Sequence, residues 1–206
     1  MSLSFKFRGF SLIEILVSLT IVTVILTVIV LKQSTYVDSA ALSNLADEIS
    51  LSLSQAQAYG IAVKELTPGS SDFSASYGLA FSLLSDGSNT NYIFFADRNN
   101  NNIYEDGWAC PLGGISECLE KATISRGNYI DDICIVRTSG ADQCGNARRV
   151  DINFERPETS SRLTFFNNSG QTISVQNLKG AKVVLKSSSG LSRSVVVYTT
   201  GQISVQ

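Results

Sequence analysis

The order of apolar and polar residues along the chain predicts one long helix. Phe10–Leu31 is almost wholly apolar and exceeds the stretch of about 20 residues that crosses a membrane core. After Lys32 the apolar and small residues recur every three or four positions, as they do on one face of a helix. This stripe consists of Leu42, Leu45, Ile49, Leu53, Ala56, Gly60 and Val63. We therefore predict a helix that is unbroken from about Ser11 to Val63.

The remainder of the chain reads as β-structure. Pro68, Gly69, Ser70 and Ser71 end the helical pattern, and short stretches rich in Val, Ile, Tyr and Phe follow, separated by turn residues. The expected strands are Tyr77–Leu84, Tyr92–Ala96, Ile133–Val136, Val150–Phe154, Leu163–Phe166, Thr172–Val175, Ala181–Leu185, Ser194–Tyr198 and Gln202–Val205. Strands do not alternate with helices, so we predict an α+β fold in which the helix packs on an antiparallel β domain.

Glu14 is the only charged residue in the apolar run. The run also contains hydroxyl side chains, which can bond to carbonyl groups of their own helix and are therefore tolerated in lipid. They are Ser11, Ser18, Thr20, Thr23 and Thr27. A carboxylate cannot be satisfied in this way and costs a few kcal/mol or more in a membrane, so Glu14 indicates a function or a partner.

Two ordinary interpretations of the apolar run compete at this point. The first is a secretory signal peptide with Lys6 and Arg8 as its basic region, but the run is longer than such a peptide needs and no small-residue cleavage site follows closely. The second is a plain membrane anchor with Glu14 near the interface. That interpretation leaves Gly9 and the sharp boundary before Phe10 unexplained.

The sequence Gly9-Phe10-Ser11-Leu12-Ile13-Glu14 resembles the class III signal of type IV prepilins and type II secretion pseudopilins. The resemblance implies that a prepilin peptidase cuts after Gly9 and methylates the new N-terminal Phe10. It also implies a counter-charge role for Glu14, opposite the Phe10 amine of a neighbouring subunit. The expected parts are a leader (1–9), a membrane and assembly helix (10–33), an amphipathic helix (34–64) and a β domain (65–206).

Two further stretches are similar to a narrower group. Ser192–Val205 resembles the closing hairpin of GspH/FimT-like minor pilins, and Gln55–Tyr59 is typical of their helix. This resemblance implies a structural minor subunit rather than an enzyme. It implies an inner-membrane protein with one span and an extracytoplasmic C-terminal domain, which reaches the cell surface or pilus after assembly. The implied partners are other pilin or pseudopilin subunits, prepilin peptidase and the inner membrane.

The composition removes several classes of chemistry. The chain of 206 residues has a formal net charge of −2 and no histidine, which excludes histidine-based triads and most zinc sites. The four cysteines lack metal-site spacing and favour disulfides in an oxidising compartment. Four cysteines allow three pairings. We favour the local pairs Cys110 with Cys118 and Cys134 with Cys144, each closing a turn-rich loop and contributing about 2–3 kcal/mol.

An asparagine-rich segment follows the expected strand Tyr92–Ala96. Its oxygen-bearing side chains alternate as in a calcium loop, which adds a backbone carbonyl and a late carboxylate. The candidate ligands are Asp97, Asn99, Asn101, Ile103, Glu105 and Asp106. Asn102 and Trp108 replace the glycine and the final glutamate of an EF-hand loop. An asparagine-rich turn without metal is the alternative, so the expected cofactor is none or calcium.

Basic residues are concentrated near the C-terminus. From Gly145 onward the chain has eight basic and three acidic residues. A basic face for DNA would use Arg148, Arg149, Arg156, Arg162, Lys179, Lys182, Lys186 and Arg193. DNA uptake on the same scaffold is therefore the alternative function. A solvated β surface with scattered charges is the simpler interpretation.

Overall fold

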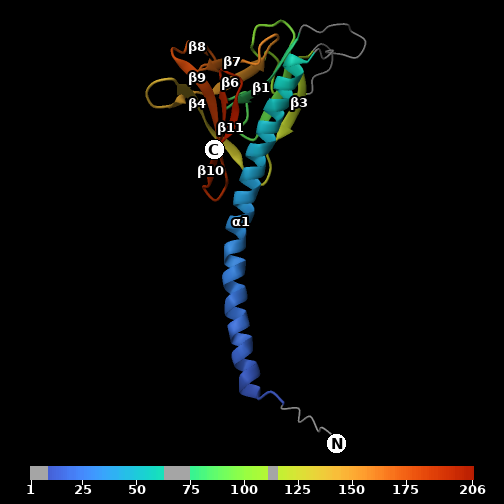
Figure 1. Cartoon of the computed structure of the whole chain (residues 1–206), viewed down its shortest axis with the longest axis vertical. Helices are drawn as coiled ribbons and strands as arrows, with labels where there is room; N and C mark the ends of the chain where they lie inside the picture. Colours follow the sequence, from blue (N-terminus) through green and yellow to red (C-terminus); the bar gives the residue numbers. More distant parts are fainter. Residues whose placement is uncertain (1–8, 63–74, 111–115) are drawn as a thin grey trace, which may run out of the picture. The chain divides into compact units, whose positions relative to one another are not determined.

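The computed structural model describes residues 9–62, 75–110 and 116–206 (Figure 1). Two units pack within themselves, one ending at Val37 and the other beginning at Asp38. Helix α1 (Leu12–Ile61) runs without a break through both and confirms the long helix predicted from the sequence. Lys6, Arg8, Val63 and the predicted break at Pro68–Ser71 lie outside the described residues.

In the N-terminal unit, α1 is a solitary helix whose apolar side chains are exposed all around. The hydroxyl groups of Ser18, Thr20, Thr23 and Thr27 behave as predicted and bond to carbonyls of the preceding turn. Ser18 Oγ donates to Glu14 O at 2.9 Å, Thr23 Oγ1 to Leu19 O at 2.7 Å, and Thr27 Oγ1 to Thr23 O at 2.8 Å. Between Leu12 and Val30 the exposed surface is therefore apolar apart from the Glu14 carboxylate.

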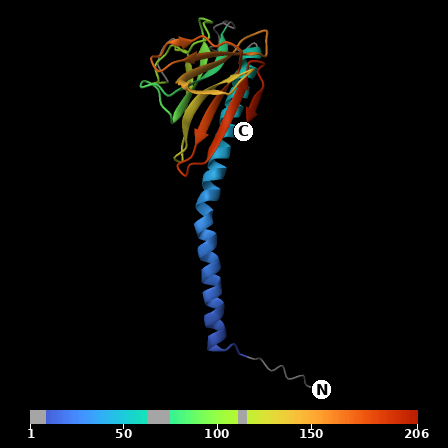
Figure 2. The same ribbon diagram turned by 90° about the vertical axis from the view of Figure 1, so that its left-hand side faces the viewer.

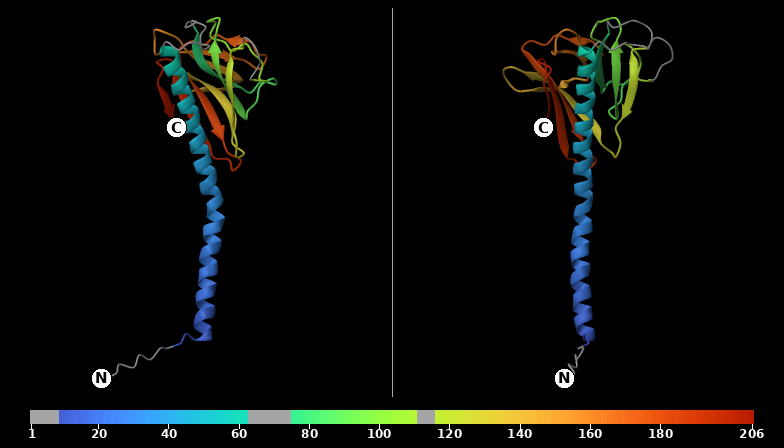
Figure 3. Two further views of the ribbon diagram at one scale, coloured as in Figure 1. Left: turned by 90° about the vertical axis from the view of Figure 1, so that its right-hand side faces the viewer. Right: turned by 45° about the vertical axis from the view of Figure 1, so that its right-hand side comes forward.

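In the C-terminal unit, the amphipathic stripe of α1 is buried. Leu42, Leu45, Ile49, Leu53 and Ala56 all belong to the main core, in which they meet side chains of two sheets. The right-hand view of Figure 3 shows this half of the helix between the two sheets, with green and yellow strands on one side and red strands on the other. The spacing of apolar residues in the sequence therefore predicted which face of α1 is buried.

In the described residues, eleven antiparallel strands form the β domain, which confirms the predicted fold class (Figure 2). The six-stranded sheet has the order β3 (Cys118–Thr123), β2 (Asn91–Asp97), β1 (Ser76–Ser82), β6 (Arg149–Phe154), β7 (Ser161–Phe166) and β8 (Thr172–Ile173). The five-stranded sheet has the order β11 (Ile203–Val205), β10 (Ser192–Tyr198), β9 (Leu178–Lys186), β4 (Tyr129–Arg137) and β5 (Gln143–Ala147).

The six-stranded sheet is covered on both faces, which explains why β1 is buried at every position. Tyr77, Leu79 and Phe81 point into the main core beneath the helix. On the opposite face, Ala80 packs in a second cluster with Ile93, Phe95, Tyr104, Trp108, Cys110 and Cys118. The asparagine-rich segment and the first disulfide therefore form a lid over the far face of this sheet.

The sequence pattern did not reveal β3 and β5. Both are edge strands, and both have several exposed residues. Edge strands need only one apolar face and often carry charge or glycine, as at Glu120, Lys121 and Gly145. The strand signal is weak wherever so few positions are buried.

Gly60 allows the helix to approach the sheet closely, and we expect Gly60→Ala to destabilise the protein. A Cβ at this position would lie 2.3 Å from the carbonyl oxygen of Phe154 on β6. Such a backbone clash costs about 1–3 kcal/mol, which outweighs the gain of about 1 kcal/mol in helix propensity. Denaturant unfolding checks this, with Gly107→Ala as the control because its added Cβ meets nothing within 4 Å. Equal stability of the two variants would contradict the prediction.

Candidate functional site

The predicted processing site lies in an accessible segment just before the helix. Gly9, Phe10 and Ser11 precede the first helical residue, Leu12, and Phe10 is 76% exposed. A Cβ added at Gly9 would meet nothing within 4 Å. The bond between Gly9 and Phe10 is therefore exposed within the described chain.

Glu14 lies in the first turn of the helix, where it could take part in an N-terminal cap. Its backbone N–H is capped, but its carboxylate is not. Ser11 is at the N-cap position and its Oγ accepts the backbone N–H of Glu14 at 3.3 Å. In a full capping box the Glu14 carboxylate would accept the Ser11 N–H in return. Among the described residues the carboxylate makes no hydrogen bond and no ion pair. It remains available for a group outside the chain.

The surface around Glu14 is continuous and apolar. The best 18-residue window of α1 has a mean hydropathy of 2.7, and none of it is buried within the described chain. By length and composition this segment can cross a membrane. In water, exposure of this apolar surface would cost a free energy of about 25 cal/mol for each Å².

A comparison with known protein families identifies a motif in the N-terminal segment. Residues 4–30 match the family model of the prokaryotic N-terminal methylation motif. The chain carries this methylation motif. The match includes Gly9, Phe10 and Glu14 and is consistent with a type IV pilin or pseudopilin. No curated protein and no solved structure matches the chain.

The asparagine-rich loop after β2 folds into a series of tight turns closed by side-chain oxygens. Asp97 accepts the N–H groups of Asn101 and Asn102, at 3.2 and 2.7 Å. Asn99 Oδ1 accepts Asn101 N–H at 3.1 Å, and Asn101 Oδ1 accepts Ile103 N–H at 2.8 Å. Asn102 has a φ of 63°, so it takes the left-handed turn that glycine makes in an EF-hand loop.

A further carboxylate, which the sequence analysis missed, closes the loop. Glu117 Oε1 accepts the Arg98 N–H at 3.3 Å and its Oε2 accepts the Glu105 N–H at 3.0 Å. The first disulfide joins Cys110 to Cys118, the residue after Glu117, and so helps to hold Glu117 beside the loop. Sequence spacing alone could not reveal this contact.

Several acidic side chains lie close to one another around this loop. Burial raises the pKa of Glu117, and repulsion from Asp97 and Glu105 adds to this effect. Protonation of Glu117 therefore favours the folded state. Its contribution to stability is complete below the ordinary value of 4.5 and is lost as pH rises through the raised folded pKa. A bound cation would relieve the same repulsion.

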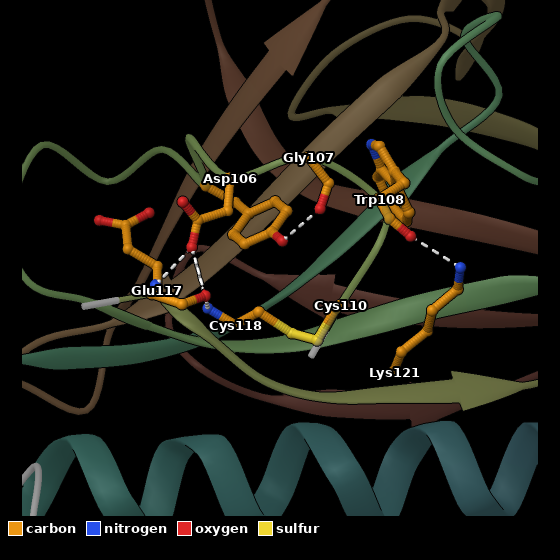
Figure 4. Close-up of a disulfide and its surroundings, with 9 residues drawn as sticks. Asp106, Gly107, Trp108, Cys110, Glu117, Cys118 and Lys121 are labelled. Atoms are coloured by element: carbon orange, nitrogen blue, oxygen red, sulfur yellow. Dashed lines mark hydrogen bonds between the residues drawn. A yellow bond between two sulfur atoms is a disulfide. The ribbon is translucent and has the colours of Figure 1, made fainter. Parts of the chain in front are cut away.

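Asp106 is not brought together with the other predicted ligands. Figure 4 shows its carboxylate turned toward the start of β3. Asp106 Oδ2 accepts Ser116 Oγ–H and Glu117 N–H, both at 2.6 Å. Burial raises the pKa of Asp106, but these hydrogen bonds outweigh it, so the pKa is lowered overall. The candidate ligands Asp97, Asn99, Asn101, Ile103 and Glu105 remain in the loop, with Glu117 beside them. The side-chain amides of Asn99 and Asn101 already donate to Glu105 Oε2 and Oε1 at 2.8 and 2.7 Å, and no three acidic side chains of the described loop converge on one point.

The loop is tied to the six-stranded sheet by a buried ion pair. Asp151 on β6 is fully buried and bonds Arg149 at 2.6 Å. Asp151 also accepts the Tyr104 N–H at 2.9 Å, while Arg149 donates to the Tyr104 carbonyl. Burial raises the pKa of Asp151, and Arg149 counteracts that rise. The pair holds Tyr104, and with it the lid, against the sheet.

The structure contains two disulfides. Cys110 pairs with Cys118 and Cys134 pairs with Cys144, and no cysteine is free. These are the two local pairings favoured from the sequence. The first closes the lid, in which Lys121 Nζ also donates to the Trp108 carbonyl at 2.7 Å (Figure 4). The second joins β4 to the edge strand β5.

The structure does not bring the eight basic residues onto one face. Arg149 and Arg162 lie on the six-stranded sheet, on the face opposite the main core, and only 13% of the Arg149 side chain is exposed. Lys182 and Lys186 alternate with core residues of β9 and pair with Asp142 and Asp131 at 3.0 and 3.4 Å. The others are Arg148 and Arg156 in connections, Lys179 on β9 and Arg193 on β10.

Calcium remains a prediction, and thermal unfolding tests it. We expect Ca²⁺ at about 1 mM to raise Tm relative to EDTA, since a Kd of about 10 µM would add about 2.7 kcal/mol. The gain should shrink as pH falls through the raised pKa of Glu117, because protons compete for that carboxylate. Glu117→Gln should lose the gain, and Glu120→Gln, an exposed position on β3, should keep it. Equal Tm values in Ca²⁺ and EDTA would rule calcium out.

The buried pair predicts unequal effects for two adjacent arginines. Arg149→Met leaves the Asp151 carboxylate buried and unpaired, so we expect a loss of about 3–5 kcal/mol in the free energy of unfolding. Arg148→Met removes one hydrogen bond of 3.4 Å to Leu83 O and should cost less than about 1 kcal/mol. Denaturant unfolding of both variants makes the comparison. Similar small losses would show that the pair does not anchor the lid.

Proposed function

We propose that this protein is a structural subunit of a type IV pilin-like filament, processed by prepilin peptidase after Gly9. The observation that carries the proposal is the uncovered apolar helix with a single unpartnered carboxylate at Glu14, within the methylation motif. The membrane holds the helix first. Other subunits cover it after assembly.

Glu14 would select the arrangement of subunits in the filament. Cleavage after Gly9 frees a positively charged amine on Phe10, which enters an apolar bundle with its helix. A carboxylate from a neighbouring subunit neutralises that amine. Removing one partner of a buried pair leaves the other charge unpaired, at a cost of several kcal/mol. The pair therefore favours one stagger between subunits over others.

Within this class, we assign the chain to the minor pilins or minor pseudopilins of GspH/FimT-like type. The resemblance of Ser192–Val205 and Gln55–Tyr59 supports this finer proposal, and so does the fold of a helix with an antiparallel β domain. In this account the helix crosses the inner membrane once and the β domain lies outside the cytoplasm. Pilus, secretion and DNA-uptake machines all use such subunits.

DNA binding is the competing role, and the described contacts favour it less. The basic side chains divide between two sheets, and Arg149, Lys182 and Lys186 already pair with acidic groups. Full-length protein in detergent should therefore bind duplex DNA weakly. Tight binding with a steep salt dependence would instead support the DNA-uptake role.

The assembly role of Glu14 can be tested in cells. We expect Glu14→Ala to reduce incorporation into sheared filaments by about tenfold or more, because a difference of 1.4 kcal/mol already corresponds to tenfold. The amount in the membrane should not change, because the helix is more apolar without the carboxylate. Asp47→Ala, an exposed acidic position on the same helix, is the control and should assemble normally. Normal incorporation of Glu14→Ala would refute the proposed role.

A further inference from the structure

The two disulfides of the C-terminal unit differ in their exposure to solvent. Cys110 and Cys118 are 9% and 8% exposed, and both pack in the second apolar cluster. In the other disulfide, Cys134 is 1% exposed, whereas Cys144 is exposed on the edge strand β5. A thiol exchanges with a disulfide by attacking one of its sulfur atoms, so access to that sulfur limits the reaction. Of the two disulfides, the second is the one that an incoming thiol can reach.

The second disulfide lies on the face of the five-stranded sheet that points away from the main core. Cys134 is placed between Ile133 and Ile135, whose side chains belong to that core. A groove of about 390 Å³ runs over the disulfide, and it is lined by both cysteines and by residues of β9 and β10. The groove gives a partner's thiol room to approach Cys144.

Basic side chains surround this disulfide. Lys182 lies directly across from Cys134 in the register of β4 and β9, and its Nζ pairs with Asp142 at 3.0 Å, two residues before Cys144. Arg193 lines the same groove and forms no ion pair among the described residues. Cations beside a disulfide attract a thiolate and stabilise the negative charge that develops on the leaving sulfur.

One acidic side chain also faces the disulfide. A carboxylate oxygen of Asp132 lies within 4.8 Å of both sulfur atoms, and Asp132 Oδ1 accepts the Ile133 N–H at 2.8 Å. This carboxylate repels an incoming thiolate, but it can accept an S–H once the bond between the sulfur atoms is broken. Asp132 therefore favours the reduced pair of thiols, while Lys182 favours the attack that produces it.

We propose that the Cys134–Cys144 disulfide is an exchange site for a dithiol oxidoreductase, with Cys144 as the sulfur attacked. A thiolate of the partner forms a bond to Cys144 Sγ, and Cys134 Sγ leaves with the electron pair and takes up a proton. The second partner thiol then attacks the first partner sulfur, releases Cys144 and passes its proton to it. The partner dithiol is oxidised to a disulfide and this chain gains two thiols. The residues of the site all belong to the C-terminal unit, so the inference does not rest on the filament role.

Reduction at this site loosens the hold on β5. This strand pairs with β4 alone, and a bulge interrupts their register between Ile133 and Ile135. Without the disulfide, the side-chain contacts that remain are those of Arg137 with Gln143 and of Lys182 with Asp142. The exchange therefore controls how firmly the edge of the five-stranded sheet is closed.

Timed alkylation of the folded full chain in detergent tests the proposal. Dithiothreitol at about 1 mM is the dithiol, and peptide mass mapping follows each cysteine. We expect Cys134 and Cys144 to be alkylated about tenfold faster than Cys110 and Cys118, because their disulfide is the accessible one. Equal rates, faster reduction of the first disulfide, or no reduction without denaturant would overturn the proposal.

A protein probe identifies the attacked sulfur. Thioredoxin whose second active-site cysteine is replaced by serine cannot complete the exchange, so acid quenching preserves the mixed disulfide. We expect this mixed disulfide at Cys144. Its formation at Cys134 or at either cysteine of the first disulfide, or its absence, would contradict the assignment.

Two lysines of β9 provide a matched pair of variants. Lys182→Met should slow reduction by about threefold or more, because the leaving sulfur loses a neighbouring cation. Lys186→Met should react like the parent, since Lys186 also forms an ion pair, with Asp131 at 3.4 Å, but lies across from Tyr129 and Ser192. A purely structural loss at Lys182 would loosen the strands and speed the reaction. Unchanged or faster reduction of Lys182→Met would therefore refute the proposed role of this lysine.

Discussion

The exposed apolar half of α1 limits the environments in which this protein can be stable. From Leu12 to Val30 no described side chain is buried, and the hydroxyl groups bond to their own helix. Such a surface is stable only in lipid or against other apolar helices. Glu14 then becomes informative, because a carboxylate in either environment needs a positive partner that the described chain does not supply. In the proposed function that partner is the amine freed at Phe10, within the matched methylation motif.

The same helix meets a different environment in the C-terminal unit. There its apolar residues narrow to a stripe, and two sheets cover it around Leu45, Ile49 and Leu53. Gly60 allows close approach at the far end of the helix. The asparagine-rich lid covers the opposite face of the six-stranded sheet, held by the Arg149–Asp151 pair and the first disulfide. Packing, rather than helix propensity, stabilises this half.

The sequence predicted the features that depend on local periodicity. The helix, its buried stripe and nine of the strands follow from the spacing of apolar residues. It did not reveal β3 and β5, whose edge positions allow charges and glycine. Contacts made across a folded loop were equally hidden. Glu117 contacts the asparagine-rich loop through the Glu105 N–H, and its own N–H donates to the Asp106 carboxylate.

The position of the mature N-terminus tests the account most directly. The mass of the N-terminal peptide should be measured on protein from native membranes and from sheared filaments. The account predicts a peptide that begins at N-methylated Phe10, with the residues up to Gly9 removed. A peptide that begins at Met1, or a cut beyond Leu31, would contradict it. Glu14 would then require another partner within the membrane.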